Sequence, residues 1–379
     1  MKIVTIIGAR PQIIKAAGLS RAISENFSDS IEEIIVHTGQ HYDENMSNVF
    51  FDELGIPRPQ YNLSVGSGKH GAQTAKMITG IEEILEKEEP NAIVLYGDTN
   101  STLAGAVAAA KIHVPIVHIE AGLRSFNKRM PEEINRIMCD HASTLLFSPT
   151  KAGTANLERE GFKLDTAAPY SSDKPGAFHC GDIMYDNSLF FSKLSDERST
   201  VLADNELTSG NFVLNTIHRN DNTDKPENLS QIFEAILHLI AEHDITFVLP
   251  LHPRTKKMME VNLSKELQAQ VHNEARLKII DPVSFLDMIA LEKHAKLIVT
   301  DSGGVQKEAF FFEKPCVILR PETEWIELVE CGAAKIVGSD KQLIIEAFNH
   351  FINNSSIEYP PLFGNGAAGK FMCEKMLEI

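Results

Sequence analysis

Short apolar runs alternate with longer segments of helical periodicity along nearly the whole chain. Many of these runs are apolar on both faces, which is typical of parallel strands covered by helices on both sides. We expect strands at Lys2–Ile7, Glu33–His37, Ala92–Tyr96, Pro115–Ile119, Thr144–Phe147, Asn211–Thr216, Thr246–Leu249, Lys278–Ile280, Lys296–Thr300 and Pro315–Leu319. Between them, segments such as Gln73–Lys87 and Pro226–Glu242 show helical spacing. Repeated strand–helix units predict doubly wound α/β domains.

The 379 residues suggest two such domains at roughly 150 residues each. A polar segment with two prolines, Lys163–Gly176, lies near the midpoint and is predicted to be the linker. We therefore expect an N-terminal domain over residues 1–170 and a second domain over 177–358. A C-terminal helix over 367–379 is expected to pack back on the first domain.

Composition excludes several classes of partner. The chain has 52 acidic and 36 basic residues, a net charge of −16 that argues against nucleic acid or an anionic membrane. Its five cysteines are scattered, without CxxC pairs or zinc spacing, as expected of free thiols in a reducing compartment. The N-terminus does not resemble a signal peptide and no apolar run approaches ~18 residues. These features predict a soluble, cytoplasmic protein.

A literal G-x-G-x-x-G occurs at Gly66–Gly71. It follows the second predicted strand rather than the first, and the next acidic residues, Glu82 and Glu83, fall inside a helical pattern instead of at a strand end. We interpret this segment as a flexible glycine loop rather than an NAD site.

The first strand–helix turn has the features of an anion site. Gly8 allows a sharp turn, and Pro11 suits the first turn of a helix. Arg10 and Lys15 lie near that helix N-terminus, where cations compensate the macrodipole badly, so an anionic ligand is expected there. The alternative is that both are solvent-exposed surface charges.

A second candidate anion site follows the strand that ends at Thr300. Ser302, Gly303 and Gly304 lead directly into a helix, which would direct backbone N–H groups at a phosphate. Glu308, one turn later, could accept hydrogen bonds from ribose hydroxyls. Alternatively, this is an ordinary turn with Ser302 as the helix N-cap.

Carboxylates follow two neighbouring predicted strands. Asp98 and Glu120 come just after the strands that end at Tyr96 and Ile119, on the edge where open α/β sheets bind ligands, and could act as general acid and base. Glu132 and Glu133 open a helix, where acids also simply favour the N-terminus.

Two histidines also follow predicted strands, His218 and His252. Each could bind phosphate or relay protons, or each could be structural.

Taken together, these segments resemble the non-hydrolysing UDP-N-acetylglucosamine 2-epimerase family over nearly the whole chain. The resemblance is carried by Gly8–Pro11, Lys15, Gln40–His41, Gly97–Thr99, His118–Arg124, Pro131–Arg136, His218–Arg219, His252–Pro253 and Asp301–Glu308. It implies a GT-B-like α/β architecture, with two Rossmann-like, doubly wound parallel-sheet lobes and an interdomain cleft for the nucleotide sugar. It also implies a cytoplasmic homodimer that needs neither NAD nor a metal.

The same resemblance implies roles for particular residues. Asp98, Glu120, Glu132 and His218 would be catalytic. The nucleotide sugar would be bound by Arg10, Lys15, Gln40, His41, Arg136, His252, Phe285, Ser302, Gly303, Gly304, Glu308 and Arg320. The implied reaction is inversion at C2 of a UDP-2-acetamido sugar, by elimination of UDP to a glycal and re-addition, for surface polysaccharide synthesis.

The chain departs from the family pattern at two positions. Gln12 stands where many members have glutamate, and Trp325 stands where many have arginine. Together with the segment Gly181–Asp186, these two residues resemble the branch of the family that acts on UDP-2,3-diacetamido-2,3-dideoxyglucuronic acid. Three alternatives stay open: a GT-B glycosyltransferase, a hydrolysing epimerase, and a catalytically silent UDP-sugar-binding protein.

Overall fold

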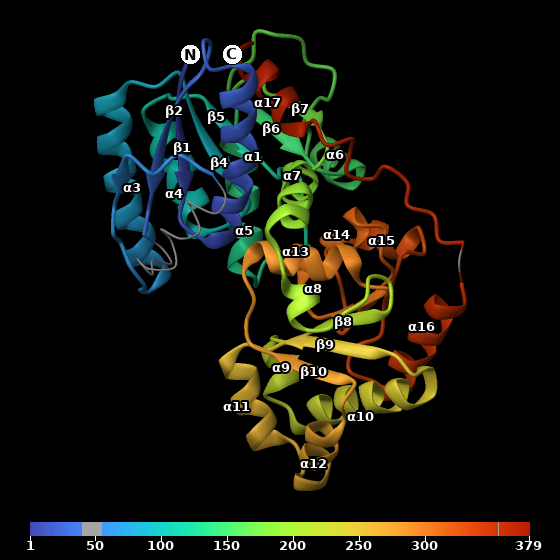
Figure 1. Cartoon of the computed structure of the whole chain (residues 1–379). Coiled ribbons are helices and arrows are strands. Elements are labelled where there is room, and N and C mark those ends of the chain that lie inside the picture. The colour runs from blue at the N-terminus through green and yellow to red at the C-terminus, as the bar shows by residue number, and fades with distance from the viewer. Residues whose placement is uncertain (40–54, 355) are drawn as a thin grey trace. The chain divides into compact units, whose positions relative to one another are not determined.

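The computed structural model describes residues 1–39, 55–354 and 356–379. They form two compact units, one made of Met1–Asn187 with Pro361–Ile379 and the other of Ser188–Pro360 (Figure 1). Helix α7 (Ile183–Arg198) passes from the first unit into the second. The predicted linker, 163–176, instead lies inside the first unit, because strand β7 (Gly176–His179) continues the first sheet by pairing with β6 (Leu145–Ser148). The boundary predicted at 170–177 was therefore too early.

The first unit contains a seven-stranded parallel sheet of order β3-β2-β1-β4-β5-β6-β7. Its remaining strands are β1 (Lys2–Ile7), β2 (Glu32–His37), β3 (Tyr61–Asn62), β4 (Ala92–Tyr96) and β5 (Ile116–Ile119). The strand order reverses between β1 and β4. At such a switch point the loops after adjacent strands separate to opposite faces and leave room for a ligand at the carboxyl edge.

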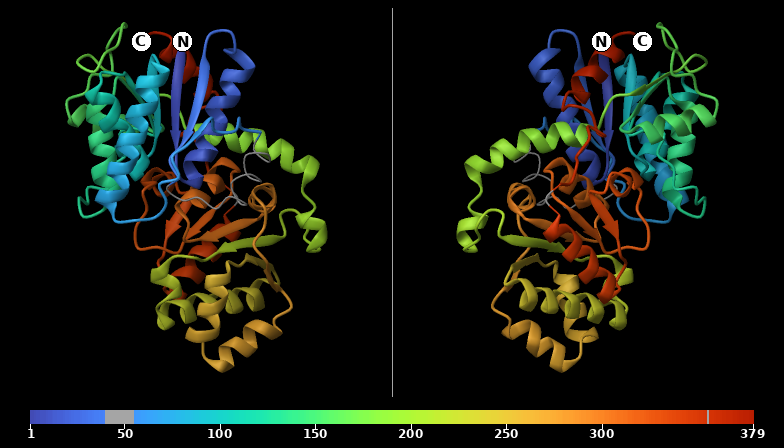
Figure 2. Two further views of the ribbon diagram at one scale, coloured as in Figure 1. Left: turned by 90° about the vertical axis from the view of Figure 1, so that its left-hand side faces the viewer. Right: turned by 90° about the vertical axis from the view of Figure 1, so that its right-hand side faces the viewer.

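Helices cover both faces of this sheet. Apolar side chains of α3 (His70–Glu88), α4 (Asn100–Lys111) and α5 (Pro131–Ala142) form a buried core with one face. Helix α6 (Lys151–Arg159) contributes Leu157 to a smaller cluster with Leu146. On the other face, α1 (Arg10–Asn26) packs against α17 (Ala368–Met376), as Figure 2 shows.

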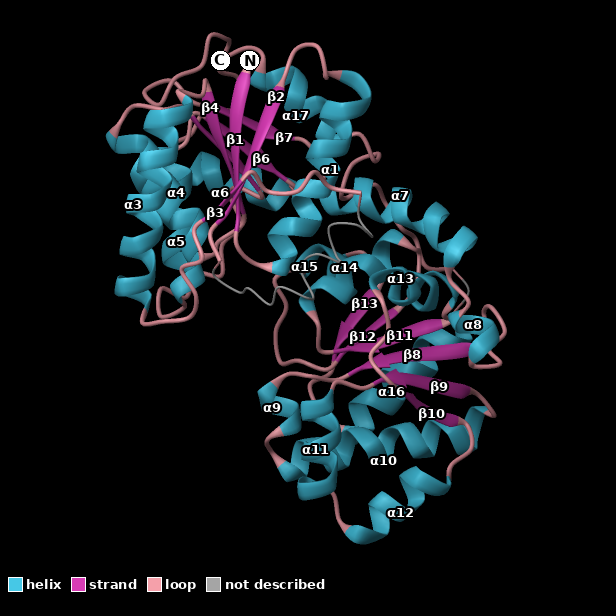
Figure 3. Ribbon diagram, turned by 60° about the vertical axis from the view of Figure 1, so that its left-hand side comes forward, coloured by secondary structure: helices cyan, strands magenta, loops and turns pink. Residues whose placement is uncertain are grey.

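The second unit has a six-stranded parallel sheet of order β10-β9-β8-β11-β12-β13, coloured magenta in Figure 3. Its strands are β8 (Phe212–Thr216), β9 (Thr246–Pro250), β10 (Leu277–Ile280), β11 (Leu297–Thr300), β12 (Cys316–Ile318) and β13 (Ala334–Ile336). Its helices are α8 (Val201–Asp204), α9 (Asn220–Thr223), α10 (Pro226–His243), α11 (Pro253–Asn262), α12 (Lys265–Asn273), α13 (Phe285–His294), α14 (Gly303–Phe311), α15 (Ile326–Glu330) and α16 (Lys341–Asn353). The switch point of this sheet lies between β8 and β11.

All ten predicted strands are present, with ends that agree within one residue. The predicted helices Gln73–Lys87 and Pro226–Glu242 correspond to α3 and α10. Three strands were missed, β3, β7 and β13. Each has only two to four residues and lies at a sheet edge, where a strand needs no two-sided apolar run.

Candidate active site

Charged side chains of opposite sign meet at the carboxyl edge of the first sheet. Lys15 of α1 forms an ion pair with Glu120, which follows β5, and both side chains are largely buried. Gly97, at the end of β4, lies against this pair, because an added Cβ would be 3.1 Å from Oε2 of Glu120 and 3.4 Å from Nζ of Lys15. The pair lines a small hollow in the first unit together with Asp182. Two of the residues predicted from sequence are thus neighbours.

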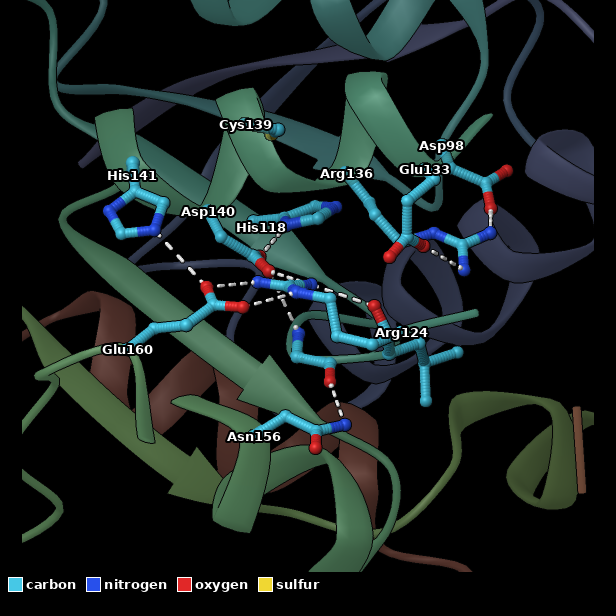
Figure 4. Close-up of polar contacts among 12 residues, drawn as sticks. Asp98, His118, Arg124, Glu133, Arg136, Cys139, Asp140, His141, Asn156 and Glu160 are labelled. Atoms are coloured by element: carbon cyan, nitrogen blue, oxygen red, sulfur yellow. Dashed lines mark hydrogen bonds and ion pairs between the residues drawn. The ribbon is translucent and has the colours of Figure 1, made fainter. Parts of the chain in front are cut away.

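Asp98 lies next to this pair and forms its own ion pair with Arg136 of α5 (Figure 4). Burial raises the pKa of the Asp98 carboxyl. Arg136 and Lys15 oppose this effect and Glu120 adds to it, and the resulting pKa lies above the ordinary value. A raised pKa suits a carboxyl that must gain and lose a proton in a reaction. The site can therefore present two interacting carboxyl groups, each with a cation beside it.

The two glutamates at the start of α5 have different surroundings. Glu133 is 1% exposed, and its carboxylate accepts hydrogen bonds from the backbone N–H groups of Ser125 (2.9 Å) and Phe126 (3.0 Å). It also contacts the guanidinium of Arg136 at 3.2 Å. Glu132, the predicted catalytic residue of the two, is exposed. Glu133 therefore fixes the loop before α5, while Glu132 is open to a ligand.

Gln12 contributes to the structure of the first turn. Its side-chain oxygen accepts hydrogen bonds from the N–H groups of Gly8 (2.9 Å) and Ala9 (3.2 Å), and its amide nitrogen donates to the carbonyl of Tyr96 (3.0 Å). The side chain is 2% exposed. An amide fits this position because it both accepts and donates. Gln12 thus ties the turn after β1 to the end of β4.

In the second unit, the turns after β8 and β11 meet at a buried carboxylate. Asp301 accepts hydrogen bonds from the backbone of His218 (3.0 Å) and Arg219 (2.9 Å) and from the side chain of Asn222 (3.0 Å). Burial alone would raise the pKa of Asp301, but His218 and the other donors outweigh it, so the pKa lies below its ordinary value. Nδ1 of His218 is 3.0 Å from the same carboxylate, which orients a ring that is half exposed.

The start of α14 has the geometry expected of an anion site. Ser302 is its N-cap, with Oγ accepting a hydrogen bond from the N–H of Val305 at 3.4 Å. The first N–H groups of a helix have no partner within it, and here they belong to Gly303 and Gly304. Oε2 of Glu308 lies 3.9 Å from the position that a Cβ on Gly304 would take, so this carboxylate reaches back over the turn.

Two further side chains border this turn. Nε1 of Trp325 donates a hydrogen bond to the carbonyl of Gly303 at 3.1 Å. Arg320 makes two hydrogen bonds of 2.8 Å to Glu324, and both residues approach the position of a Gly303 Cβ at 3.6 Å. The predicted binding residue Arg320 therefore lies beside the glycine turn.

Two other predicted residues have structural contacts. His252 is the N-cap of α11, and its Nδ1 accepts a hydrogen bond from the N–H of Arg254 at 3.3 Å. Phe285 is 9% exposed and packs edge-to-face on Phe191, with ring centroids 5.2 Å apart.

Of the remaining predicted residues, Arg10 is exposed at the first position of α1. Gln40 and His41 lie outside the described residues.

The segment Gly66–Gly71 follows edge strand β3 and ends in the first turn of α3, which begins at His70. A Cβ added to Gly66 or Gly71 would have no atom within 4 Å. Dinucleotide-binding glycines instead allow close packing between backbone, helix and pyrophosphate. This supports the interpretation as a glycine loop.

All five cysteines are free thiols. Among residues 1–39, 55–354 and 356–379, no group of His, Cys, Asp or Glu side chains could hold a metal ion. In the same ranges, no helix is both long and apolar enough to cross a membrane.

Comparison with known proteins identifies the family. Residues 24–377 match the family of UDP-N-acetylglucosamine 2-epimerase. The chain belongs to this family. It is 48% identical over 379 residues to UDP-2,3-diacetamido-2,3-dideoxy-D-glucuronate 2-epimerase of Pseudomonas aeruginosa, with both chains covered completely. A UDP-N-acetylglucosamine 2-epimerase homolog of Methanococcus maripaludis is 48% identical over 97% of this chain and 96% of its own.

Solved structures of the family agree with the fold. The crystal structure of Methanocaldococcus jannaschii UDP-GlcNAc 2-epimerase in complex with UDP-GlcNAc and UDP matches with a TM-score of 0.82 and 41% identity. The match covers 100% of this chain and 99% of that one. The predicted GT-B-like α/β class is therefore confirmed.

Several residues that organise the site of this epimerase-family chain were not predicted from its sequence. Asp140, Asp301 and Asn135 are buried polar residues, and Asn135 donates a hydrogen bond to the backbone carbonyl of Asp98 at 2.9 Å. Asp140 and Asn135 lie in a helix and Asp301 directly follows a strand. Of these three, Asn135 and Asp301 fall within segments that carry the family resemblance, and Asp140 does not. No local sequence pattern indicates that Asn135 or Asp301 makes these hydrogen bonds.

Proposed function

We propose that this protein is a non-hydrolysing 2-epimerase whose substrate is UDP-2,3-diacetamido-2,3-dideoxy-D-glucuronate. The full-length identity of 48% with the Pseudomonas aeruginosa enzyme of that name supports this substrate. Trp325, which stands where many members of the family have arginine, supports it as well. UDP-N-acetylglucosamine is the second candidate, because a Methanocaldococcus jannaschii enzyme named for that activity is 42% identical.

One observation carries the proposal of epimerisation: two interacting carboxyl groups, each paired with a cation, lie at the carboxyl edge of the first sheet. Asp98 pairs with Arg136, and Glu120 with Lys15. A module that only bound nucleotide sugars would have no need for two carboxyl groups, one of raised pKa, at this edge.

The chemistry explains why such groups are needed. The C2 proton of the sugar has no carbonyl group next to it, so simple abstraction is unfavourable. In the proposed reaction the C2 proton goes to a protein base while the C1–O bond breaks and its electron pair leaves with UDP, which gives a glycal. UDP then adds back at C1 and a proton is delivered to the other face of C2. Carboxylates near the ring stabilise developing positive charge.

The leaving diphosphate gains negative charge in the same step. We assign it to the N–H groups at the start of α14, with Ser302, Gly303 and Gly304, and to the neighbouring cation Arg320. Glu308 would bind the ribose hydroxyls, and His218, oriented by Asp301, would contact the phosphates. Preorganised donors of this kind stabilise a leaving group without reorganisation.

The decisive experiment is proton NMR in heavy water with UDP-2,3-diacetamido-2,3-dideoxy-D-glucuronate and, separately, with UDP-N-acetylglucosamine. Deuterium at C2 together with the manno product from the first sugar is the expected result. The same product from only the second sugar would assign the other branch. Free UDP with free sugar would indicate a hydrolysing enzyme. Bound UDP without any change in either sugar would favour a glycosyltransferase.

The resemblance to the family also suggests a homodimer in the cytoplasm. Both remain proposals. Light scattering during gel filtration, with and without UDP, would determine the oligomeric state.

A further inference from the structure

Glu120 has a strained backbone. Its φ is +76°, in the left-handed region that residues other than glycine rarely adopt. Such a conformation persists only where the surroundings hold it, and it recurs at functional sites. Glu120 directly follows β5, and its N–H and that of Ala121 both donate to the carbonyl of Phe147 at 3.0 Å.

A single buried carboxylate holds the chain on both sides of Glu120. Asp140 of α5 has no exposed surface. Its Oδ1 is 2.6 Å from Nδ1 of His118, two residues before Glu120. Its Oδ2 accepts a hydrogen bond at 3.1 Å from the N–H of Gly122, two residues after Glu120. Figure 4 shows Asp140 between His118 and Arg124, and Arg124 binds the same oxygen as Gly122 at 2.7 Å.

His118 extends this arrangement to the other predicted carboxyl group. Its Nε2 is 2.8 Å from the carbonyl of Gly97, the residue before Asp98. A carboxylate and a carbonyl are both acceptors, so His118 satisfies both only as an imidazolium with two N–H groups. Burial alone would lower the pKa of His118, but Cys139 and Asp140 outweigh it and raise that pKa well above its ordinary value.

Other residues complete the packing after Glu120. Gly122 has a φ of +79°, and an added Cβ would lie 2.4 Å from the carbonyl oxygen of Gly153. Asn156 donates a hydrogen bond to the carbonyl of Gly122 at 3.0 Å. The segment after Glu120 is therefore fixed against α6 as well as α5.

We propose that Asp140 is a positioning residue for the reaction: it holds Glu120 in its strained conformation through His118 and Gly122, and it holds the Gly97–Asp98 turn through His118. The inference rests on the proposed function. Asp140 touches neither substrate nor reacting atoms. Its effect would appear in the chemical step and leave nucleotide binding, which we assign to the second unit, unchanged.

The test is the variant Asp140→Asn in the full-length protein. Asparagine keeps the size of the side chain but removes the charge that stabilises the His118 imidazolium, so His118 loses one of its two donors. We expect kcat to fall by roughly 100-fold, as for a misplaced catalytic group. KM for the UDP-sugar and Kd for UDP, measured by calorimetry, should stay within about twofold of wild type.

The matched control is Glu160→Gln. Glu160 binds Arg124 at 2.7 Å and His141 at 3.1 Å at the outer end of the same cluster, so this variant weakens the cluster without touching His118 or Gly122. Its kcat should stay near that of wild type. All variants are assayed below the onset of thermal unfolding, which is measured separately.

A second variant covers the case in which Asp140→Asn does not fold. In His118→Asn the amide can replace Nδ1 toward Asp140 but cannot reach the carbonyl of Gly97, and kcat should fall while Kd for UDP is unchanged. If both variants fold, their effects on kcat should add only in part, because both weaken the support that His118 gives to the Gly97–Asp98 turn.

A folded Asp140→Asn or His118→Asn protein that turns over within twofold of the Glu160→Gln control would overturn the proposal. So would a parallel loss of UDP affinity. Failure of the proposed function gives a different result, since wild type would then epimerise neither UDP-sugar.

Discussion

Glu292 of α13 is a carboxyl group in an unusual place. It is 1% exposed, and among the described residues none donates a hydrogen bond to either of its oxygens. The charged group that it faces is the carboxyl of Glu308 on the adjacent helix α14. Burial, and then the charge of Glu308, raise the pKa of Glu292 well above 4.5. Glu292 therefore releases its proton less readily in the folded protein than in the unfolded chain.

This predicts a pH-dependent stability. The unfolded chain loses the Glu292 proton near pH 4.5, whereas the raised pKa shifts this loss to higher pH in the folded chain. Wild type therefore loses stability as pH rises from about 4.5 toward the folded pKa. Glu292→Gln is neutral in both states and should lack this loss. Urea unfolding of both proteins at pH 5 and pH 8 measures it: the variant should gain stability relative to wild type at pH 8. An equal pH dependence would show that Glu292 is ionised when folded.

A single hydrogen bond from Trp325 supports the glycine turn that we propose binds the nucleotide. Its Nε1 donates a hydrogen bond to the carbonyl of Gly303. Its ring makes a cation–π contact with the ammonium of Lys307, which lies 4.2 Å from the ring centroid. Trp325→Phe keeps an aromatic ring and removes only the donor. Loss of one hydrogen bond, about 1 kcal/mol, should weaken UDP binding by roughly fivefold in calorimetry. Unchanged affinity would mean that the glycine turn does not depend on this bond.

At the scale of elements, the start of α5 carries two glutamates with different roles to test: Glu133 has structural contacts, and Glu132 is proposed to act on the substrate. Glu133→Gln should lower the free energy of unfolding by about 2 kcal/mol, because one of its oxygens loses acceptor capacity toward the loop at Ser125 and Phe126. Glu132→Gln, at an exposed position, should change stability by no more than about 0.5 kcal/mol.

The same pair should behave in the opposite way in turnover. If Glu132 acts on the substrate, Glu132→Gln lowers kcat by roughly 100-fold or more, the usual contribution of acid–base groups. Thermal unfolding of the two variants checks the prediction on stability, and steady-state kinetics checks the prediction on turnover. A Glu132 variant with full turnover would remove this residue from the proposed catalytic set.

At the scale of the whole molecule, each unit has its own switch point, and each should respond to a different part of the ligand. Hydrogen exchange of the full-length protein, read by mass spectrometry, tests this. UDP alone should slow exchange in 217–222 and 301–308, where the turns after β8 and β11 meet at Asp301. The complete UDP-sugar should add protection in 97–100 and 120–124. Protection in the first unit by UDP alone would contradict this division of roles.

Asp186 holds the C-terminal helix α17 to the first unit. The carboxylate of Asp186 accepts hydrogen bonds from the N–H groups of Ala368 (3.2 Å) and Gly369 (2.8 Å) at the start of α17. A Cβ on Gly369 would be 3.1 Å from the Cβ of Ala22 in α1, so glycine permits the close packing of α1 and α17. Residues 361–379 therefore belong to the first unit although they follow the second in sequence.

The sequence by itself determined the fold class, the central strands and the sheet edges at which the proposed site residues lie. Buried parallel strands require apolar residues on both faces, so a short run of apolar residues is enough to locate them in the sequence. Residues that follow such strands must lie at one edge of a sheet, which is why the positions of Asp98, Glu120 and Ser302 at these edges could be predicted.

Only the tertiary structure decided how these groups are held. Edge strands such as β7 lack the two-sided apolar pattern. Because β7 was not predicted, the predicted domain boundary was too early. The pairing of Lys15 with Glu120, the contacts of Asp140 around Glu120, and the meeting of Glu292 with Glu308 join residues from separate elements. Their hydrogen bonds and pKa values depend on distances and burial that arise only when the elements pack, so no local spacing encodes them.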